Sequence, residues 1–162
     1  MAYLIDGHNL IGQMRDLRLD DPDDEARLVE QLNRYMLRHN RRCTVVFDRG
    51  LPGGRAVELS TSRVEVVFAH GGTNADRIIL ERVGAARDAR RWQIVSDDRA
   101  IVDEARRRGM QVLSAREFAA RLGAARAPGN ADDEDPNPHI SPDDVAYWQR
   151  EFSRTPRKPP AR

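Results

Sequence analysis

Residues 2–9 read AYLIDGHN, and this stretch decides the fold because an apolar segment ends there abruptly on polar residues. Residues 2–5 are predicted to form a buried strand. Asp-Gly at positions 6 and 7 is a common turn dipeptide, since Gly accepts a positive φ and Asp bonds nearby backbone N–H groups. DGHN is therefore explained either as a tight turn or as a functional segment at the end of a strand.

Apolar runs and amphipathic segments alternate along the rest of the chain. Further strands are predicted at residues 43–48, 64–69, 92–96 and 110–114, and helices at residues 24–39, 75–87, 98–109 and 115–122. Strands that alternate with helices indicate a parallel sheet covered on both faces. We therefore predict an α/β fold in which a parallel sheet of about five strands lies between helices.

The length and composition narrow the class of protein. A chain of 162 residues with a net charge of +1 accommodates one domain with an appendage. The single cysteine, Cys43, excludes an intramolecular disulfide and a cysteine-based metal cluster, and we expect it to be a small buried side chain. The first residues already form a strand, and no apolar run reaches membrane-spanning length. We expect a cytoplasmic protein with no membrane partner.

The composition changes near Gly123. Residues 1–123 are predicted to form the folded body, and residues 124–140, rich in Ala, Pro, Asn and Asp, a linker. Residues 141–162 are predicted to form a short helix followed by a basic disordered end. An apolar stripe on that helix would dock on the body or on a partner, or the segment would assist contact with RNA or the ribosome.

Aspartates follow the predicted strands at the end where open parallel sheets bind ligands. Asp6 follows the first strand, Asp48 ends the second, and Asp97 and Asp98 follow the fourth. Asp76 begins the helix that comes after the third strand. Each acid alone would also suit a turn or a helix cap. Together, five carboxylates at one edge repel one another unless a cation or a proton neutralises them.

A hard divalent cation is the occupant that such a cluster favours. Mg²⁺ or Mn²⁺ takes oxygen ligands, keeps several waters and is commonly held by one or two carboxylates plus substrate phosphate. Asn9, three residues beyond Asp6, would add an amide oxygen or orient a water. Zinc is disfavoured because the histidines are scattered and there is no pair of thiolates. A carboxylate-bound metal with an activated water is suited to phosphodiester hydrolysis.

The charge that remains outside this cluster is basic. With the five acids at the site, the rest of the body would attract a polyanion such as nucleic acid. Arg49 and Arg55 flank the loop after the second strand and are candidate contacts to RNA phosphates.

Four blocks carry a resemblance to a known family. IDGHNLI at 5–11, VVFDRG at 45–50, GGTNADRII at 71–79 and IVSDDRAI at 94–101 occur in this order. They resemble the NYN domains of the PIN-like nuclease superfamily, and most closely the YacP-like branch, over residues 2–122. The resemblance implies a PIN-like three-layer sandwich and a metal-dependent endoribonuclease. It also implies an RNA partner, with messenger and ribosome-associated RNA as candidates.

The resemblance assigns roles to individual residues. Position 75 departs from the pattern, because this chain has alanine where some members have a second acid before the aspartate. The residues that match the family's metal-binding and catalytic positions are Asp6, Asn9, Asp76, Asp98 and, beside it, Asp97.

Two other functions remain open at this point. One is a small phosphoester hydrolase, but an aspartyl-phosphate mechanism needs a second Asp in the first loop, where this chain has His8. The other is an RNA-binding or ribosome-associated module of the same fold without catalysis. His8 itself is expected to be a solvated side chain in a loop. A dinucleotide-binding domain is disfavoured because no glycine-rich loop follows the first strand.

Overall fold

A six-stranded sheet forms the centre of the computed structural model, which describes residues 1–48 and 54–125. Five strands run parallel in the order β4–β2–β1–β5–β6, and β3 pairs antiparallel with β4 at one edge. The strands are β1 (Ala2–Asp6), β2 (Arg42–Phe47), β3 (Gly54–Arg55), β4 (Val64–Phe68), β5 (Trp92–Val95) and β6 (Gln111–Leu113).

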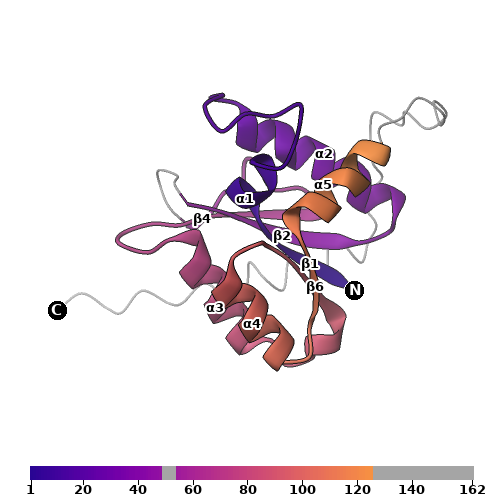
Figure 1. Cartoon of the computed structure of the whole chain (residues 1–162). Coiled ribbons are helices and arrows are strands. Elements are labelled where there is room, and N and C mark those ends of the chain that lie inside the picture. The colour runs from indigo at the N-terminus through magenta and orange to yellow at the C-terminus, as the bar shows by residue number, and fades with distance from the viewer. Residues whose placement is uncertain (49–53, 126–162) are drawn as a thin grey trace, which may run out of the picture. The chain divides into compact units, whose positions relative to one another are not determined.

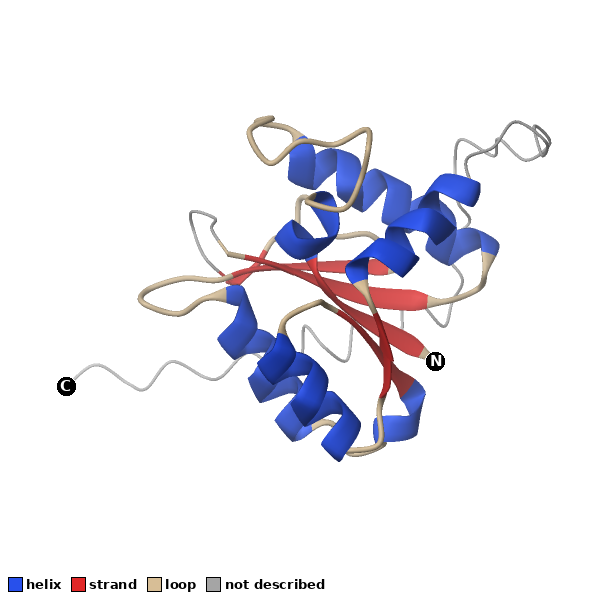
Figure 2. Ribbon diagram, in the orientation of Figure 1, coloured by secondary structure: helices blue, strands red, loops and turns tan. Residues whose placement is uncertain are grey.

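Helices cover both faces of the sheet, as Figures 1 and 2 show. Helices α1, α2 and α5 lie against one face, and α3 and α4 lie against the other. This is the three-layer α/β arrangement that the alternating pattern predicts. The helices are α1 (Gly7–Ile11), α2 (Asp24–Arg38), α3 (Ala75–Ala85), α4 (Arg99–Arg107) and α5 (Ala115–Ala124), with a 3-10 turn at Ala89–Arg91.

Alternate side chains of β1 point into two separate apolar cores. Tyr3 and Ile5 pack with residues of α2 and α5, whereas Leu4 packs with residues of α3 and α4 on the other face. Because β1 lies between β2 and β5, it is buried on both sides. This position explains why its sequence is apolar up to Asp6, its last residue.

The predicted strands and main helices are confirmed, with ends that differ by one or two residues. Cys43 is buried, as expected. Ser114 caps α5, and Glu117 completes a capping box with it. Three short elements were not predicted, namely α1, β3 and the 3-10 turn at Ala89–Arg91. Ala124, the first residue of the predicted linker, still belongs to α5, and Ala125 caps that helix. The rest of the linker, the helix at 141–152 and the basic end lie outside the described residues.

The helix α1 corrects the expectation for DGHN. Gly7, His8 and Asn9 do not form an isolated turn or loop, because they are the first residues of a helix that Asp6 caps. Among the residues described, no helix combines the length and the apolar character that crossing a membrane requires.

Candidate active site

Asp6 lies where β1 ends and α1 begins. It adopts an extended backbone conformation, and its side chain accepts a hydrogen bond from the backbone N–H of Asn9 at 3.2 Å. This is the bond by which an N-cap residue satisfies the first turn of a helix. The residue is only 6% exposed, so its carboxylate is held in place and largely removed from water.

Gly7 allows this abrupt change from strand to helix. A Cβ atom at position 7 would lie 2.3 Å from a ring carbon of Phe47. The Phe47 ring is fully buried and stacks on Phe68, with a centroid distance of 5.4 Å, so it has little room to move. The close neighbour of Gly7 is therefore an aromatic side chain at the end of β2, and the first residue of α1 has to lack a side chain.

Asp6 is surrounded by negative charge. Its pKa is raised to about 6, first by burial and then by the charges of Asp76 and Asp48, while the hydrogen bond from the Asn9 N–H and the charge of His8 lower it. The pKa of Asp76 is also raised, first by burial and then by the charges of Asp98 and Asp48. Four carboxylates from different elements therefore interact electrostatically and lie near one another. They gather where the parallel strands end, and we call this edge of the sheet the carboxyl edge.

Helix starts position three of these acids. Asp48 follows β2, and its Oδ1 accepts the N–H of Ala75 at 2.9 Å, in the first turn of α3. Asp98 caps α4 by accepting the N–H of Ile101 at 3.1 Å. Asp76 is in the first turn of α3, whose cap is Asn74. Capping and a role in a charged cluster are thus compatible here, since each carboxylate has a second oxygen.

Asp97 is placed differently from its neighbour. Its side chain is exposed and accepts the N–H of Ala115 at 3.0 Å, at the start of α5. It is not among the charges that shift the pKa of Asp6 or Asp76. The structure therefore brings together Asp6, Asp48, Asp76 and Asp98, whereas the Asp97 carboxylate is turned toward α5.

Asn9 connects the ends of β1 and β5. Its Oδ1 accepts the backbone N–H of Asp97 at 3.2 Å, while its own N–H bonds Asp6. The strand order reverses between β1 and β5, and this switch point is where open α/β sheets bind ligands. The amide oxygen of Asn9 is thus engaged across the switch point, which leaves its NH₂ group as the donor available to a ligand.

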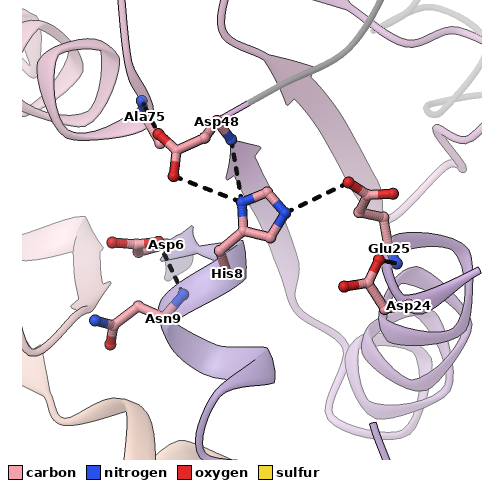
Figure 3. A network of polar contacts seen from close by, with 7 residues as sticks. All are labelled: Asp6, His8, Asn9, Asp24, Glu25, Asp48 and Ala75. Atoms are coloured by element: carbon pink, nitrogen blue, oxygen red, sulfur yellow. Dashed lines mark hydrogen bonds and ion pairs between the residues drawn. The ribbon is translucent and has the colours of Figure 1, made fainter. Parts of the chain in front are cut away.

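His8 was expected in a loop as a solvated side chain, and the structure corrects this (Figure 3). Its Nε2 lies 3.4 Å from Glu25 Oε1, and its Nδ1 lies 3.6 Å from Asp48 Oδ2 and accepts the Asp48 N–H at 3.3 Å. Because Nδ1 accepts a hydrogen bond, the neutral tautomer carries its hydrogen on Nε2, facing Glu25. His8 therefore links the start of α2 to the end of β2.

The acids at the start of α2 belong to this network, and sequence reasoning missed them. Asp24 is 4% exposed, and its Oδ1 accepts the N–H of Glu25 at 2.7 Å (Figure 3). Burial and the charge of Asp24 raise the pKa of Glu25. In the sequence these two acids are ordinary residues of a first helical turn, and no spacing relates them to His8 or Asp48.

The donor set suits a hydrated hard cation. Carboxylate oxygens are the ligands that Mg²⁺ and Mn²⁺ prefer. The pKa of Asp6 is raised first by burial and then by the negative charges of Asp76 and Asp48, which a cation would neutralise. In the described part of the chain, no three His, Cys, Asp or Glu side chains are grouped closely enough to hold a metal by themselves. Mg²⁺ does not need such a cage, because it usually retains waters and binds one or two carboxylates.

This fold and this acidic edge define a class. The chain belongs to the YacP-like NYN domains, whose family model matches residues 3–151, and NYN domains have a nuclease-like fold. The matched region extends beyond residue 122, where the resemblance read from the four blocks ended.

The relatives come from Bacillus subtilis. Over 81 residues the chain is 36% identical to the "Uncharacterized protein YacP" of strain 168, and the match spans about half of each protein, 47% of either chain. A crystal structure of Rae1 (YacP) is similar with a TM-score of 0.62 at 20% identity, covering 94% of this chain and 82% of that one. A mutant of Rae1 gives a TM-score of 0.60 at 24% identity, with 76% of each chain covered. These structural likenesses show the shared fold.

The RNA-binding candidates are described only in part. Arg49 lies outside the described residues. The backbone of Arg55 is in β3, where it pairs with Val67 near the carboxyl end of β4. The backbone of Arg55 thus lies near the carboxyl edge of the sheet.

Proposed function

We propose that this protein is a metal-dependent endoribonuclease that hydrolyses RNA phosphodiester bonds. The observation that carries the proposal is the buried carboxylate of Asp6, whose pKa is raised to about 6 by burial and by the charges of Asp76 and Asp48. A group in that environment gains strongly from a divalent cation. Membership in the NYN family supports nuclease chemistry and RNA as the substrate class.

In this proposal the acids divide the tasks among them. Asp6, Asp76 and Asp98 would hold Mg²⁺ or Mn²⁺ together with waters, and Asp48 would add its charge. When bound, the ion lowers the pKa of a water and neutralises charge on the phosphate. The Asn9 NH₂ group would donate to a phosphate oxygen or orient a water. His8 holds Asp48 through the contacts of Figure 3, while Asp97 anchors α5.

The experiment is a cleavage assay on the full chain. Single-stranded and hairpin RNA, labelled at one end, are incubated with the protein in Mg²⁺, in Mn²⁺ or in EDTA. We expect internal cleavage in either metal and none in EDTA. Products that are the same in EDTA, or the same with Asp6→Asn, contradict the proposal. RNA that is bound but uncut would indicate a binding module, and turnover of a small phosphomonoester would indicate a phosphoester hydrolase.

A further inference from the structure

A second polar feature lies at the amino edge of the sheet, where the parallel strands begin. An open hollow of about 400 Å³ is lined chiefly by Ala2, Arg41, Arg42, Arg63, Arg91 and Trp92. We refer to it as the arginine hollow. Four of the described residues that line it are arginines, and none of the described lining residues is acidic.

The strand register explains how these residues come together. Ala2 is aligned with Arg42 on one side and with Trp92 on the other, and Val64, directly after Arg63, is aligned with Cys43. The row from β4 to β5 therefore crosses four strands. Adjacent strands lie about 4.8 Å apart, so this row is about 14 Å long. The small side chain of Ala2 leaves space between its two larger neighbours.

The end of α2 delivers the fourth cation. Asn40 has a φ of 49° and turns the chain out of the helix, and the Arg41 N–H then bonds the Met36 carbonyl oxygen at 2.8 Å. This is a left-handed helix C-cap, a position that Asn tolerates. The Asn40 side chain also accepts a hydrogen bond from Arg63 Nη1 at 2.9 Å. The neutral amide of Asn40 thus orients Arg63 but does not neutralise its positive charge.

Arginines elsewhere on the described surface commonly face a carboxylate on the same helix. Arg34 pairs with Glu30, Arg77 with Glu81, and similar pairs occur in α4. In the hollow, Arg91 pairs with Asp88 at 3.1 Å, whereas neither Arg41 nor Arg63 forms an ion pair with any described residue. The hollow therefore differs from the solvated charged faces of this arginine-rich chain.

Trp92 adds a flat apolar surface to these charges. It is half-buried and packs against the core formed with α3 and α4. Aromatic rings stack with unpaired bases, and arginines beside them contact phosphates and stack as well. A planar base next to a phosphodiester is the chemistry that this combination recognises.

We infer that the arginine hollow is an RNA-binding site separate from the cleavage site, which holds a single-stranded segment by its phosphates and by a base stacked on Trp92. The inference rests on the proposed function for the identity of the polyanion. The strand β1 joins the two sites, with Ala2 at the hollow and Asp6 at the acids. At about 3.3 Å per residue they are about 13 Å apart along the strand, on opposite edges. The segment bound in the hollow is therefore not the segment that is cut.

The test compares RNA affinity in two variants with the same loss of charge. Arg41→Gln, Arg63→Gln and Arg91→Gln are combined in one full-length variant. Arg87→Gln, Arg106→Gln and Arg116→Gln, which are exposed and lie outside the hollow, form the matched control. Binding of a labelled single-stranded RNA is measured by anisotropy in EDTA over a range of salt concentrations, so that neither metal nor cleavage contributes.

We expect the hollow variant to bind roughly tenfold or more weakly at low salt, and the control to change much less. Each phosphate contact on single-stranded nucleic acid contributes about 0.7 to the salt slope, so three lost contacts lower the slope by about 2. Equal affinities and slopes for the two variants overturn the inference. Melting temperatures are recorded for both variants.

A second measurement leaves the arginines unchanged. The chain has two tryptophans, so Trp148→Phe leaves Trp92 as the only one. We expect single-stranded RNA to quench its fluorescence, and fully paired RNA to quench it less. Fluorescence that does not respond to saturating RNA overturns the stacking at Trp92.

The two proposals fail separately. A wild-type protein that cleaves RNA while the hollow variant binds RNA normally contradicts the hollow and supports the nuclease. A wild-type protein that never cleaves, but whose RNA affinity falls in the hollow variant, contradicts the nuclease and supports the hollow.

Discussion

The carboxyl and amino edges of the sheet carry opposite charges, although the same strands supply both. At one edge Asp6 ends β1 and Asp48 follows β2. At the other edge Arg42 begins β2 and Arg63 precedes β4. A parallel sheet gathers all strand beginnings together and all strand ends together, so the residue types at these positions add up over each edge. In the two proposals, RNA would be attracted to the amino edge without a metal, whereas the carboxyl edge would repel it unless a cation is bound. Binding and cutting should therefore differ in their need for metal.

Replacement of Asp6 should have the largest effect. We expect Asp6→Asn to lower RNA cleavage by more than about a hundredfold, since loss of a mere outer-shell partner of a metal already costs up to about that much. RNA affinity in EDTA should be unchanged or higher, because a negative charge is removed from the carboxyl edge. Initial rates and anisotropy measure the two effects. A variant that cuts at the wild-type rate would remove Asp6 from the site.

The pH dependence of stability isolates the same carboxylate. Its pKa rises from an ordinary value of 3.8 to about 6 in the folded protein, so the folded state binds this proton more tightly than the unfolded chain does. The stability that this group contributes to the folded protein is greatest below about pH 4 and is lost as the pH rises through 6. As the pH rises between these limits, we expect the free energy of unfolding of Asp6→Asn to increase by up to about 3 kcal/mol relative to that of the wild type. Urea unfolding in EDTA gives both curves, and parallel curves would contradict the shift.

Gly7 tests whether the carboxyl edge is rigidly built. We expect Gly7→Ala to lower the free energy of unfolding by about 1–3 kcal/mol, because the new methyl group overlaps the buried Phe47 ring. Gly84→Ala in α3 is the control, since a Cβ there meets no atom within 4 Å. Alanine in a helix should stabilise that variant by up to about 1 kcal/mol. Equal effects at the two positions would show that the ring yields.

Measuring metal affinity distinguishes the neighbouring acids Asp97 and Asp98. The changes expected in this measurement are the smallest of the four. We expect Asp76→Ala and Asp98→Ala to weaken Mn²⁺ binding roughly tenfold each, as loss of a ligand contact or its support commonly does. Asp97→Ala should leave the affinity near that of the wild type, because this carboxylate bonds the Ala115 N–H. Calorimetric titration compares the three variants. A weaker site in Asp97→Ala alone would reverse the assignment of the two adjacent acids.

The layers of the fold could be predicted from the sequence because they follow from local periodicity. The face of α2 with Leu28, Leu32 and Met36 is buried as its spacing predicts. Short elements could not be predicted in this way. The five residues of α1 are too few to show a period, and the two residues of β3 are strand only because β4 lies beside them.

The candidate site likewise has a part that the sequence predicts and a part that it does not. Acids that follow strands could be identified because the topology alone brings strand ends together. The contact of His8 with Glu25 depends on how α2 packs beside α1, and no local pattern encodes that packing. The direction of the Asp97 side chain likewise depends on where α5 begins. Asp98, the next residue in the chain, instead caps α4.

The buried Cys43 offers a practical consequence. It lies on β2 between Tyr3 of β1 and Val64 of β4, it is 4% exposed, and burial raises the pKa of its thiol. A thiol in this state does not react with alkylating reagents, because reaction requires an accessible thiolate. As it is the only cysteine in the chain, each alkylation event reports that the centre of the sheet has opened. The natural sequence thus contains its own reporter of unfolding, and the labelling rate can be read by mass spectrometry without any engineered probe.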